Sequence, residues 1–382
     1  MRALYEFFSG GGMVRAAMRD EWNCLFANDI SEKKAAAYTA NWGGDHLKIK
    51  DITNIKPIDL PGRADLAWAS FPCQDLSLAG NGVGLNGERS GTFWAFWKLM
   101  MALKEEGRHP SLIALENVYG TLTSHEGKDF ESIIRAIVAG GYRPGAMVID
   151  AARFLPQSRP RLFIVAVEGS VPIPEQLIAD TPSKIWHPSG IVHAFDRMPK
   201  RLRSHWVWWQ LPLPVDRPKE LKDLLEEDPR DVQWHTQEET NRLCSMMTSI
   251  NRLKVDRAIH HASQTGERVV GTIYRRMREG LQRAEARFDG VSGCLRTPSG
   301  GSSLQTIIVI DKNTVRSRLL SRRETARLMG LDDNYKLPER YSDAYHLTGD
   351  GVAVPVVNHL VRHIFNPIID TIKAIDLAKE AA

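Results

Sequence analysis

The sequence has a cysteine at a position that suits nucleophilic chemistry. Residues 64–70 form a short apolar run that predicts a buried strand, and Pro72 ends it, so Cys73 is expected just beyond a strand end. Open α/β sheets carry their chemistry at the carboxyl ends of strands. The glycine-rich run 80–84 suits a loop that closes over a substrate. Cys73 is therefore a candidate thiolate nucleophile, although a lone intracellular cysteine is more often a small buried apolar residue.

An acid and two arginines are further candidates for the same site. Residues 111–115 predict another buried strand that ends at Glu116, and an acid there would share the crevice with the thiol and suit proton donation. Arg159 and Arg161 are two residues apart on predicted extended backbone, so their side chains point the same way and suit binding a phosphate or a carboxylate. For an isolated pair of this kind, solvated surface charge is the commoner explanation.

Glycines and acids near the start indicate a nucleotide-like cofactor. Residues 3–8 predict a strand, residues 13–19 predict a helix, and the Ser-Gly-Gly-Gly run 9–12 between them lets the backbone approach a ligand. Such a turn is as often a plain connection. Asp29 ends the next predicted strand, where an acid commonly holds ribose hydroxyls, and Asp51 suits a bond from an adenine amino group. Each acid taken singly is more often a helix cap or a solvated group.

Composition excludes several classes of protein. The chain of 382 residues is 43% hydrophobic and 25% charged, as in a globular protein of one large or two unequal domains. No run reaches the ~18 apolar residues of a membrane span, the start lacks the shape of a secretory signal, and the cysteines form no C-x-x-C pair. We therefore expect a cytoplasmic protein with free thiols and no metal site. The net charge of +4 is too small to indicate nucleic-acid binding by itself.

The order of predicted elements indicates two domains. Across residues 1–167, strands and helices alternate, which favours an α/β domain with a doubly wound, mostly parallel sheet. Prolines and tryptophans break this alternation in residues 168–318. Basic clusters at 197–203 and 274–278 suit phosphate contacts, with solvated helix faces as the alternative. Residues 319–382 are expected to return to the first domain.

An ordered set of short motifs runs from the first predicted strand to near the C-terminus. The motifs are Phe8-x-Gly10-x-Gly12, Asp29, Asp51, Pro72-Cys73-Gln74, Glu116-Asn117-Val118, Gln157-x-Arg159-x-Arg161, Arg323-Glu324-x-x-Arg327-Leu328-Met329-Gly330 and Gly349-Asp350-Gly351-Val352. This set resembles the DNA (cytosine-5)-methyltransferase family of bacteria. Chance agreement of all the motifs in this order is negligible, and only residues 168–318 contain none of them.

The resemblance implies a covalent mechanism at cytosine. Carbon 5 of cytosine is a poor nucleophile, and addition of the Cys73 thiolate to carbon 6 turns the ring into an enamine that takes a methyl group. By the family's pattern, Glu116 hydrogen-bonds ring nitrogen 3 and the amino group. Arg161 then lies near the cytosine O2, and Arg159 supports the pocket and the nucleotide backbone.

The resemblance also implies the fold and the cofactor. It implies a Rossmann-like catalytic domain that binds S-adenosylmethionine and releases S-adenosylhomocysteine, with a smaller target-recognition domain inserted at 168–318. The residues that it assigns to the cofactor are Phe8, Ser9, Gly10, Gly11, Gly12, Asp29, Ile30, Asp51, Ile52, Pro72, Phe93, Asp350 and Val352. Met13 and Asp350 depart from the family's usual glycine and asparagine, and the second change puts that cofactor contact in doubt.

The partner implied by the resemblance is double-stranded DNA. The target base must be flipped out of the duplex to reach a thiol in a crevice. The residues expected to approach DNA are Gln74, Ser77 and Asn81 in the closing segment and Arg296, Thr297 and Ser299 in the recognition domain. We expect a monomer close to the nucleoid, working beside a separate restriction endonuclease or alone.

Two other functions fit parts of the sequence. An RNA cytosine methyltransferase shares this fold, but the branch that modifies transfer RNA carries a Cys-Phe-Thr motif that is absent here and has a smaller second domain. A non-catalytic DNA-binding relative would be expected to lack Cys73 or Glu116, and both are present. The sequence therefore favours the DNA methyltransferase.

Overall fold

The computed structural model describes residues 1–72, 91–214, 219–278, 280–297 and 304–380. By its internal contacts the chain divides into two compact units. Unit 1 comprises Met1–Ile149, Pro160–Leu213 and Val356–Ala382, and unit 2 comprises Asp150–Arg159 and Pro214–Pro355. The chain therefore passes between the units four times, after Ile149, Arg159, Leu213 and Pro355.

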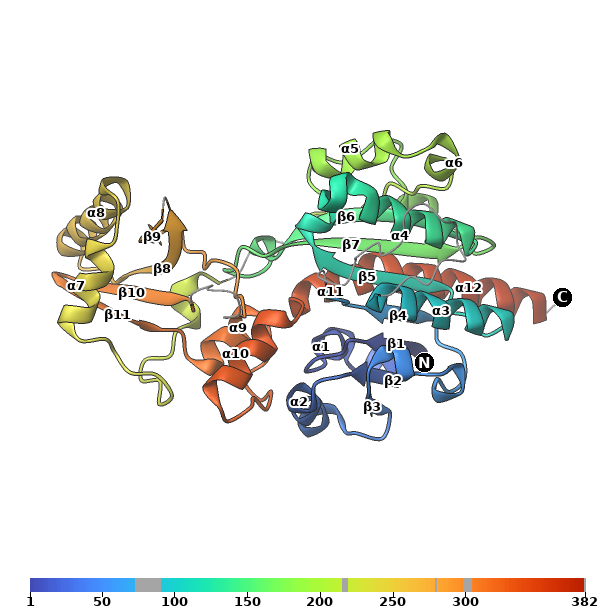
Figure 1. The fold of residues 1–382 in the computed structure, drawn as a ribbon, viewed down its shortest axis with the longest axis horizontal. Coiled ribbons are helices and arrows are strands. Elements are labelled where there is room, and N and C mark those ends of the chain that lie inside the picture. Colours follow the sequence, from blue (N-terminus) through green and yellow to red (C-terminus); the bar gives the residue numbers. More distant parts are fainter. Residues whose placement is uncertain (73–90, 215–218, 279, 298–303, 381–382) are drawn as a thin grey trace. The chain divides into compact units, whose positions relative to one another are not determined.

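Unit 1 is built on a mostly parallel sheet of seven strands in the order β3-β2-β1-β4-β5-β7-β6 (Figure 1). β1 pairs in parallel with β2 on one side and β4 on the other, and β5 pairs with β7 in the antiparallel sense. The strands are β1 (Arg2–Phe7), β2 (Trp22–Asp29), β3 (Leu47–Ile49), β4 (Leu66–Ala69), β5 (Leu112–Val118), β6 (Tyr142–Asp150) and β7 (Pro160–Glu168). The predicted doubly wound α/β fold is confirmed, and the strand order reverses between β1 and β4, where such sheets bind ligands.

Helices bury both faces of this sheet, as the continuous apolar runs of its strands require. On one face, Tyr5 and Phe7 of β1 share a core with Phe96 of α3 and Ile133 of α4. On the other, Trp68 of β4 meets Phe365 edge to face. The helices of unit 1 are α1 (Met13–Met18), α2 (Glu32–Trp42), α3 (Thr92–Glu105), α4 (Lys128–Ala139), α5 (Ser189–Arg197), α6 (Lys200–Arg203) and α12 (Asn366–Glu380), with α11 (Val354–Leu360) and a π-helical turn (Val361–Phe365) before α12.

One stretch within Tyr341–Glu380 is long and apolar enough by composition to cross a membrane. Of that stretch, 61% is buried inside the protein. Burial of this kind is usual for the core helix of a globular protein, so the composition is accounted for by packing.

Unit 2 contains an antiparallel sheet of four strands in the order β11-β10-β8-β9. Its strands are β8 (Val269–Arg278), β9 (Leu281–Arg287), β10 (Thr306–Asp311) and β11 (Thr314–Leu319), and its helices are α7 (Gln237–Ser245), α8 (Ser249–Thr265), α9 (Arg322–Leu328) and α10 (Tyr341–Asp350). One face of the sheet packs against α8, where Ile273, Ala284 and Ile308 share a core with Val255 and Ala258. Residues 274–278 lie on β8, so the alternative interpretation of this basic cluster as a solvated helix face is wrong.

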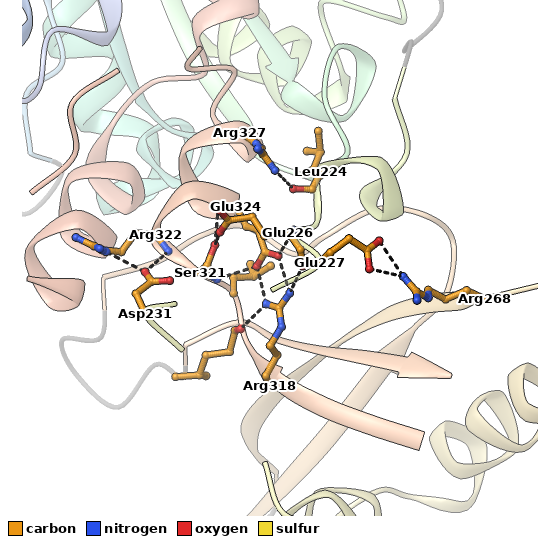
Figure 2. Close-up of polar contacts among 12 residues, drawn as sticks. Leu224, Glu226, Glu227, Asp231, Arg268, Arg318, Ser321, Arg322, Glu324 and Arg327 are labelled. Carbon is orange, nitrogen blue, oxygen red and sulfur yellow. Dashed lines mark hydrogen bonds and ion pairs between the residues drawn. The ribbon is translucent and has the colours of Figure 1, made fainter. Parts of the chain in front are cut away.

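A buried ion pair joins β11 to α9 in unit 2 (Figure 2). The two terminal guanidinium nitrogens of Arg318 each lie 2.7 Å from a carboxylate oxygen of Glu324, and neither side chain is more than 1% exposed. Ser321 caps α9 by accepting a bond from the Glu324 amide, and Glu324 in return accepts one from the Ser321 amide. The reciprocal bonds satisfy two backbone groups at the helix start, which fixes where α9 begins relative to the sheet.

Candidate active site

The ends of β4 and β5 are joined by a side chain. Asn117, which is 6% exposed, donates from Nδ2 to the carbonyl of Phe71 at 3.0 Å. Its Oδ1 accepts bonds from the Val118 amide and the Thr121 hydroxyl. Asn117 therefore uses both ends of its amide group to hold the chain just before Pro72, beside the end of β5.

The predicted acid and one predicted arginine meet on neighbouring strands. Glu116 on β5 is 6% exposed, and its Oε1 lies 3.2 Å from Nε of Arg161 on β7. The strands are antiparallel neighbours with Val118 opposite Arg161, so the two side chains meet diagonally. The pair gives the acid a fixed orientation at the carboxyl end of β5.

Arg159 lies in unit 2, outside β7, and is 2% exposed. Its guanidinium donates to the carbonyl oxygens of Leu295, Gly349 and Gly351 at 3.0, 2.8 and 2.6 Å, and to the Cys294 sulfur. Arg159 and Arg161 have different partners in the structure, and the prediction that their side chains point the same way stays a prediction. Arg159 joins three carbonyl groups of segments far apart in the sequence.

The turn after β1 has the left-handed backbone that glycine supplies. Gly10 and Gly12 have φ angles of 55° and 76°, and Phe8 adopts 57°. A Cβ atom added to Gly12 would lie 2.4 Å from the Trp42 ring, whereas one added to Gly10 would meet no atom within 4 Å. Gly12 therefore allows close helix packing, and Gly10 leaves open space above the turn.

Asp29 supports this turn from the end of β2. Its carboxylate accepts bonds from the amides of Gly10 and Ser31, each at 2.8 Å. Each carboxylate oxygen has a second lone pair that is available to a ligand. Beside it, the Ile30 side chain is 66% exposed and is therefore accessible for packing against a flat ligand.

The remaining cofactor candidates of unit 1 differ in accessibility. Asp51 caps the 3₁₀ turn Ile52–Asn54 through Thr53, and these hydrogen bonds lower the pKa of its carboxyl group. Ile52 is 4% exposed, and Phe93 is 1% exposed, with its ring stacked on Trp97. Phe93 is therefore a core residue in this structure, and its cofactor role stays a prediction.

In unit 2, the candidates from two distant segments come together. A Cβ atom added to Gly349 would lie 3.2 Å from the Thr297 amide nitrogen and 3.3 Å from Arg296. Asp350 is exposed at the end of α10, whereas Val352 is 4% exposed. The approach is tight, and a side chain at 349 would require the backbone at 296–297 to shift by a few tenths of an ångström.

A family model for C-5 cytosine-specific DNA methylases matches residues 3–366, which is most of the chain. The chain belongs to this family. Its enzyme class is DNA (cytosine-5-)-methyltransferase.

Proteins named as methyltransferases resemble the chain over almost its whole length. The Type II methyltransferase M.NlaX of Neisseria lactamica is 23% identical over 95% of this chain and 96% of its own. M.NgoBI of Neisseria gonorrhoeae is 25% identical over 92% and 89%. A crystal structure of a DNMT2 variant from Spodoptera frugiperda, 16% identical, superposes with a TM-score of 0.61 over 96% of this chain and all of that chain, which shows a common fold.

Several residues predicted for this methylase lie outside the described part of the chain. They are Cys73, Gln74, Ser77, Asn81 and Ser299. Among the described residues, no group of three or more His, Cys, Asp or Glu side chains is arranged to hold a metal ion. Ser9, at 7% exposure, and Gly11 belong to the described turn after β1.

Sequence reasoning missed two residues that shape the cofactor side of this methylase. Trp42 donates to the Gly11 carbonyl at 3.1 Å, and its position just past the predicted helix gave no signal. Glu6 is fully buried in β1. Its position as the one charged residue in the apolar run 3–8 could have indicated a buried acid. Burial raises the pKa of Glu6 to about 8; Arg15 opposes this effect, and Asp29 adds to it.

Proposed function

We propose that this protein methylates carbon 5 of a flipped-out cytosine in a specific double-stranded DNA site, through a covalent adduct with Cys73. The observation that carries the proposal is the bond from Asn117 to the Phe71 carbonyl. It ties the strand end that bears Glu116 to the chain that leads through Pro72 into Cys73. An acid and a thiol from adjacent strand ends are what attack on a pyrimidine ring needs.

Cys73, Glu116 and Arg161 each contact a different atom of the cytosine ring in this proposal. The Cys73 thiolate forms a bond to carbon 6, and electron density moves to ring nitrogen 3, where a proton shared with Glu116 would stabilise it. The Arg161 guanidinium, fixed beside Glu116 at 3.2 Å, lies ready for the ring O2. Arg159 supports the pocket indirectly, because its donors already hold the backbone at Leu295 and Gly349.

The turn after β1 fits S-adenosylmethionine. Gly10 leaves space for a ligand, Asp29 has lone pairs for ribose hydroxyls, and exposed Ile30 offers an apolar face for adenine. Asp51 is held by Thr53 in a form that accepts a bond from the adenine amino group. When bound, S-adenosylmethionine supplies an electrophilic methyl group.

The finer roles in DNA binding are part of the same proposal. Residues 168–318 choose the target sequence, with Arg296 and Thr297 at base edges. The segment that contains Gln74, Ser77 and Asn81 closes over the flipped base. The enzyme acts in the cytoplasm as a monomer in a restriction-modification system, beside a separate endonuclease.

Methyl transfer from labelled S-adenosylmethionine tests the proposal. Unmethylated genomic DNA, double-stranded RNA and transfer RNA are offered at equal nucleotide concentration, and 5-methylcytosine is measured by mass spectrometry. We expect product in DNA at one sequence context. Cys73→Ala should abolish the product while duplex binding persists, and the wild type should form a denaturant-stable adduct with 5-fluorocytosine DNA. Methylation of RNA alone, or turnover by Cys73→Ala, would refute the proposal.

A further inference from the structure

The outer part of the β8–β9 hairpin in unit 2 is a two-stranded ribbon. β8 pairs with β10 only as far as Ile273, but it pairs with β9 from Thr272 to Arg278. Residues 274–278 and 281–285, here called the arginine ribbon, therefore pair with each other beyond the end of β10, and Ala284 also forms an isolated bridge with Met247. In sequence, residues 274–285 hold four arginines and two glutamates.

The ribbon places two like charges directly opposite one another. Arg276 on β8 is the register partner of Arg283 on β9. Directly opposed side chains in an antiparallel pair lie about 5 Å apart, and like charges there destabilise the sheet by several tenths of a kcal/mol. Arg283 forms no ion pair within the described residues. The opposed arginines Arg276 and Arg283 therefore destabilise the free protein, and an anion bound between them would remove this repulsion.

The same face of the ribbon carries further positive charge. Alternation along β8 puts Tyr274, Arg276 and Arg278 on one face, opposite the face that Ile273 packs on α8. Arg276 and Arg278 are 47% and 56% exposed. Arg276 also lies over the Tyr274 ring, 4.5 Å from its centroid, which holds its guanidinium in place.

One acid on this face limits the charge without cancelling it. Glu285 lies 3.0 Å from Arg278 and 4.0 Å from Arg276. With Arg283, the face has three arginines against one glutamate among the described ribbon residues, and Leu281 at its end is 56% exposed. The surface is therefore positive, and its guanidinium groups are planar donors that match phosphate oxygens.

We propose that the arginine ribbon binds the phosphodiester backbone of duplex DNA through Arg276, Arg278 and Arg283. The inference rests on the proposed function and adds phosphate-binding residues to it that differ from the base-reading candidates Arg296 and Thr297. A two-stranded β-ribbon fits the major groove of B-form DNA, whereas the major groove of A-form RNA is deep and narrow. The shape of the ribbon therefore favours DNA over RNA.

The salt dependence of DNA binding tests the ribbon. Each phosphate contact contributes about 0.9 to the slope of log affinity against log salt concentration. Fluorescence anisotropy with a mixed-sequence duplex should give the double variant Arg276→Gln/Arg283→Gln a slope smaller by about 1.8. Arg276→Lys/Arg283→Lys should keep most of the wild-type slope, because the charge remains.

A matched control removes the same charge from the opposite side of the sheet. Arg242 on α7 and Arg257 on α8 are exposed, and Arg242→Gln/Arg257→Gln should leave the slope unchanged. The ribbon variant should melt at a temperature no lower than the wild type, since it loses a like-charge pair. A purely structural role of the arginines would lower that melting temperature.

Three results would overturn the ribbon proposal. They are an unchanged slope in Arg276→Gln/Arg283→Gln, an equal change in the control variant, and a change seen with an RNA duplex but not with DNA. Failure of the proposed function gives a different result. A wild type that binds DNA through the ribbon but makes no 5-methylcytosine would refute the proposed methylation and leave the ribbon proposal standing.

Discussion

Glu116 is the residue whose chemistry depends most directly on a proton. In the proposed mechanism, attack by Cys73 puts electron density on ring nitrogen 3, and a carboxylate without a proton would repel it. Glu116→Gln keeps the size and an amide donor, and its carbonyl still faces Arg161, but the transferable proton is lost. We expect methylation to slow by about two to four powers of ten, with cofactor binding intact.

Single-turnover methylation across pH measures this effect. Glu116→Asp is the companion variant, and it should also be slow because a side chain shorter by one methylene retreats from the ring. A glutamine variant as fast as the wild type would remove proton sharing by Glu116 from the mechanism.

Glu6 predicts a pH dependence of stability. Its pKa of about 8 lies above the usual value because the carboxyl group is buried. The folded state then binds more protons than the unfolded state from about pH 4.5 to 8, so its contribution to stability is present below this window and is lost as pH rises through it. As pH rises through this window, the free energy of unfolding of Glu6→Gln should increase relative to that of the wild type by at most about 1.4 kcal/mol per pH unit.

Urea unfolding at several pH values checks the Glu6 prediction. The groups that face Glu6 are Arg15, Asp29, Tyr38 and Cys24. Cys24→Ser serves as a control, because it changes a neighbour of Glu6 but leaves the carboxyl group in place. A difference between Glu6→Gln and wild type that stays constant across pH would contradict the raised pKa.

At the residue scale, type and position could be predicted from sequence better than direction. Glu116 and Asp29 follow buried strands, and in the structure both lie at the strand ends indicated by their apolar runs. The direction of Arg159 could not be predicted, because its carbonyl partners at 295, 349 and 351 are far away in sequence. Backbone acceptors leave no mark in the sequence.

At the scale of elements, the β11–α9 connection depends on a pair of buried charges. Removing one partner leaves the other uncompensated in the interior, so Glu324→Gln should destabilise the protein by about 3–5 kcal/mol. The double variant Arg318→Met/Glu324→Leu should recover the part of this loss that comes from the uncompensated charge, but not the bonds that Glu324 accepts from the Ser321 and Glu226 amides. Urea unfolding gives both values, and a single variant that costs under about 1 kcal/mol would contradict the prediction.

Apolar strands were predictable, whereas charged ones were not. The runs at 3–8, 64–70 and 111–115 became β1, β4 and β5 because both faces of a parallel sheet are buried. The end of β8 reads Arg-Arg-Met-Arg, with no alternation, because its side chains are exposed on both faces. Its pairing with β9 is a long-range feature that local propensity does not encode.

At the scale of the whole molecule, binding of S-adenosylhomocysteine should raise the stability of the folded protein by mass action. At a concentration of 100 times the Kd the expected gain is about 2.7 kcal/mol. Asp29→Asn keeps one acceptor for the Gly10 amide but loses the charge that we assign to ribose binding, so its Kd should rise about 10- to 100-fold.

Thermal melting with and without S-adenosylhomocysteine measures the gain directly. Asp20→Asn, on the 3₁₀ turn after α1, is a control for loss of one exposed carboxylate near the same strands. An equal ligand-induced rise in the melting temperature of Asp29→Asn and the wild type would remove Asp29 from the cofactor site.

The four passages of the chain between the two units bear on how such a gene can recombine. Exchange of the DNA for residues 214–355 with that of a relative would carry over most of unit 2 but leave residues 150–159 behind. Arg159, in the part left behind, donates to main-chain carbonyls at 295, 349 and 351. Every amino acid offers that carbonyl, so a donor sequence with the same backbone path satisfies these three bonds whatever its side chains, whereas the contact with the Cys294 sulfur depends on the side chain at 294. Under the proposed role of this block in choosing the target sequence, exchange of this kind would transfer specificity without a compensating change at Arg159.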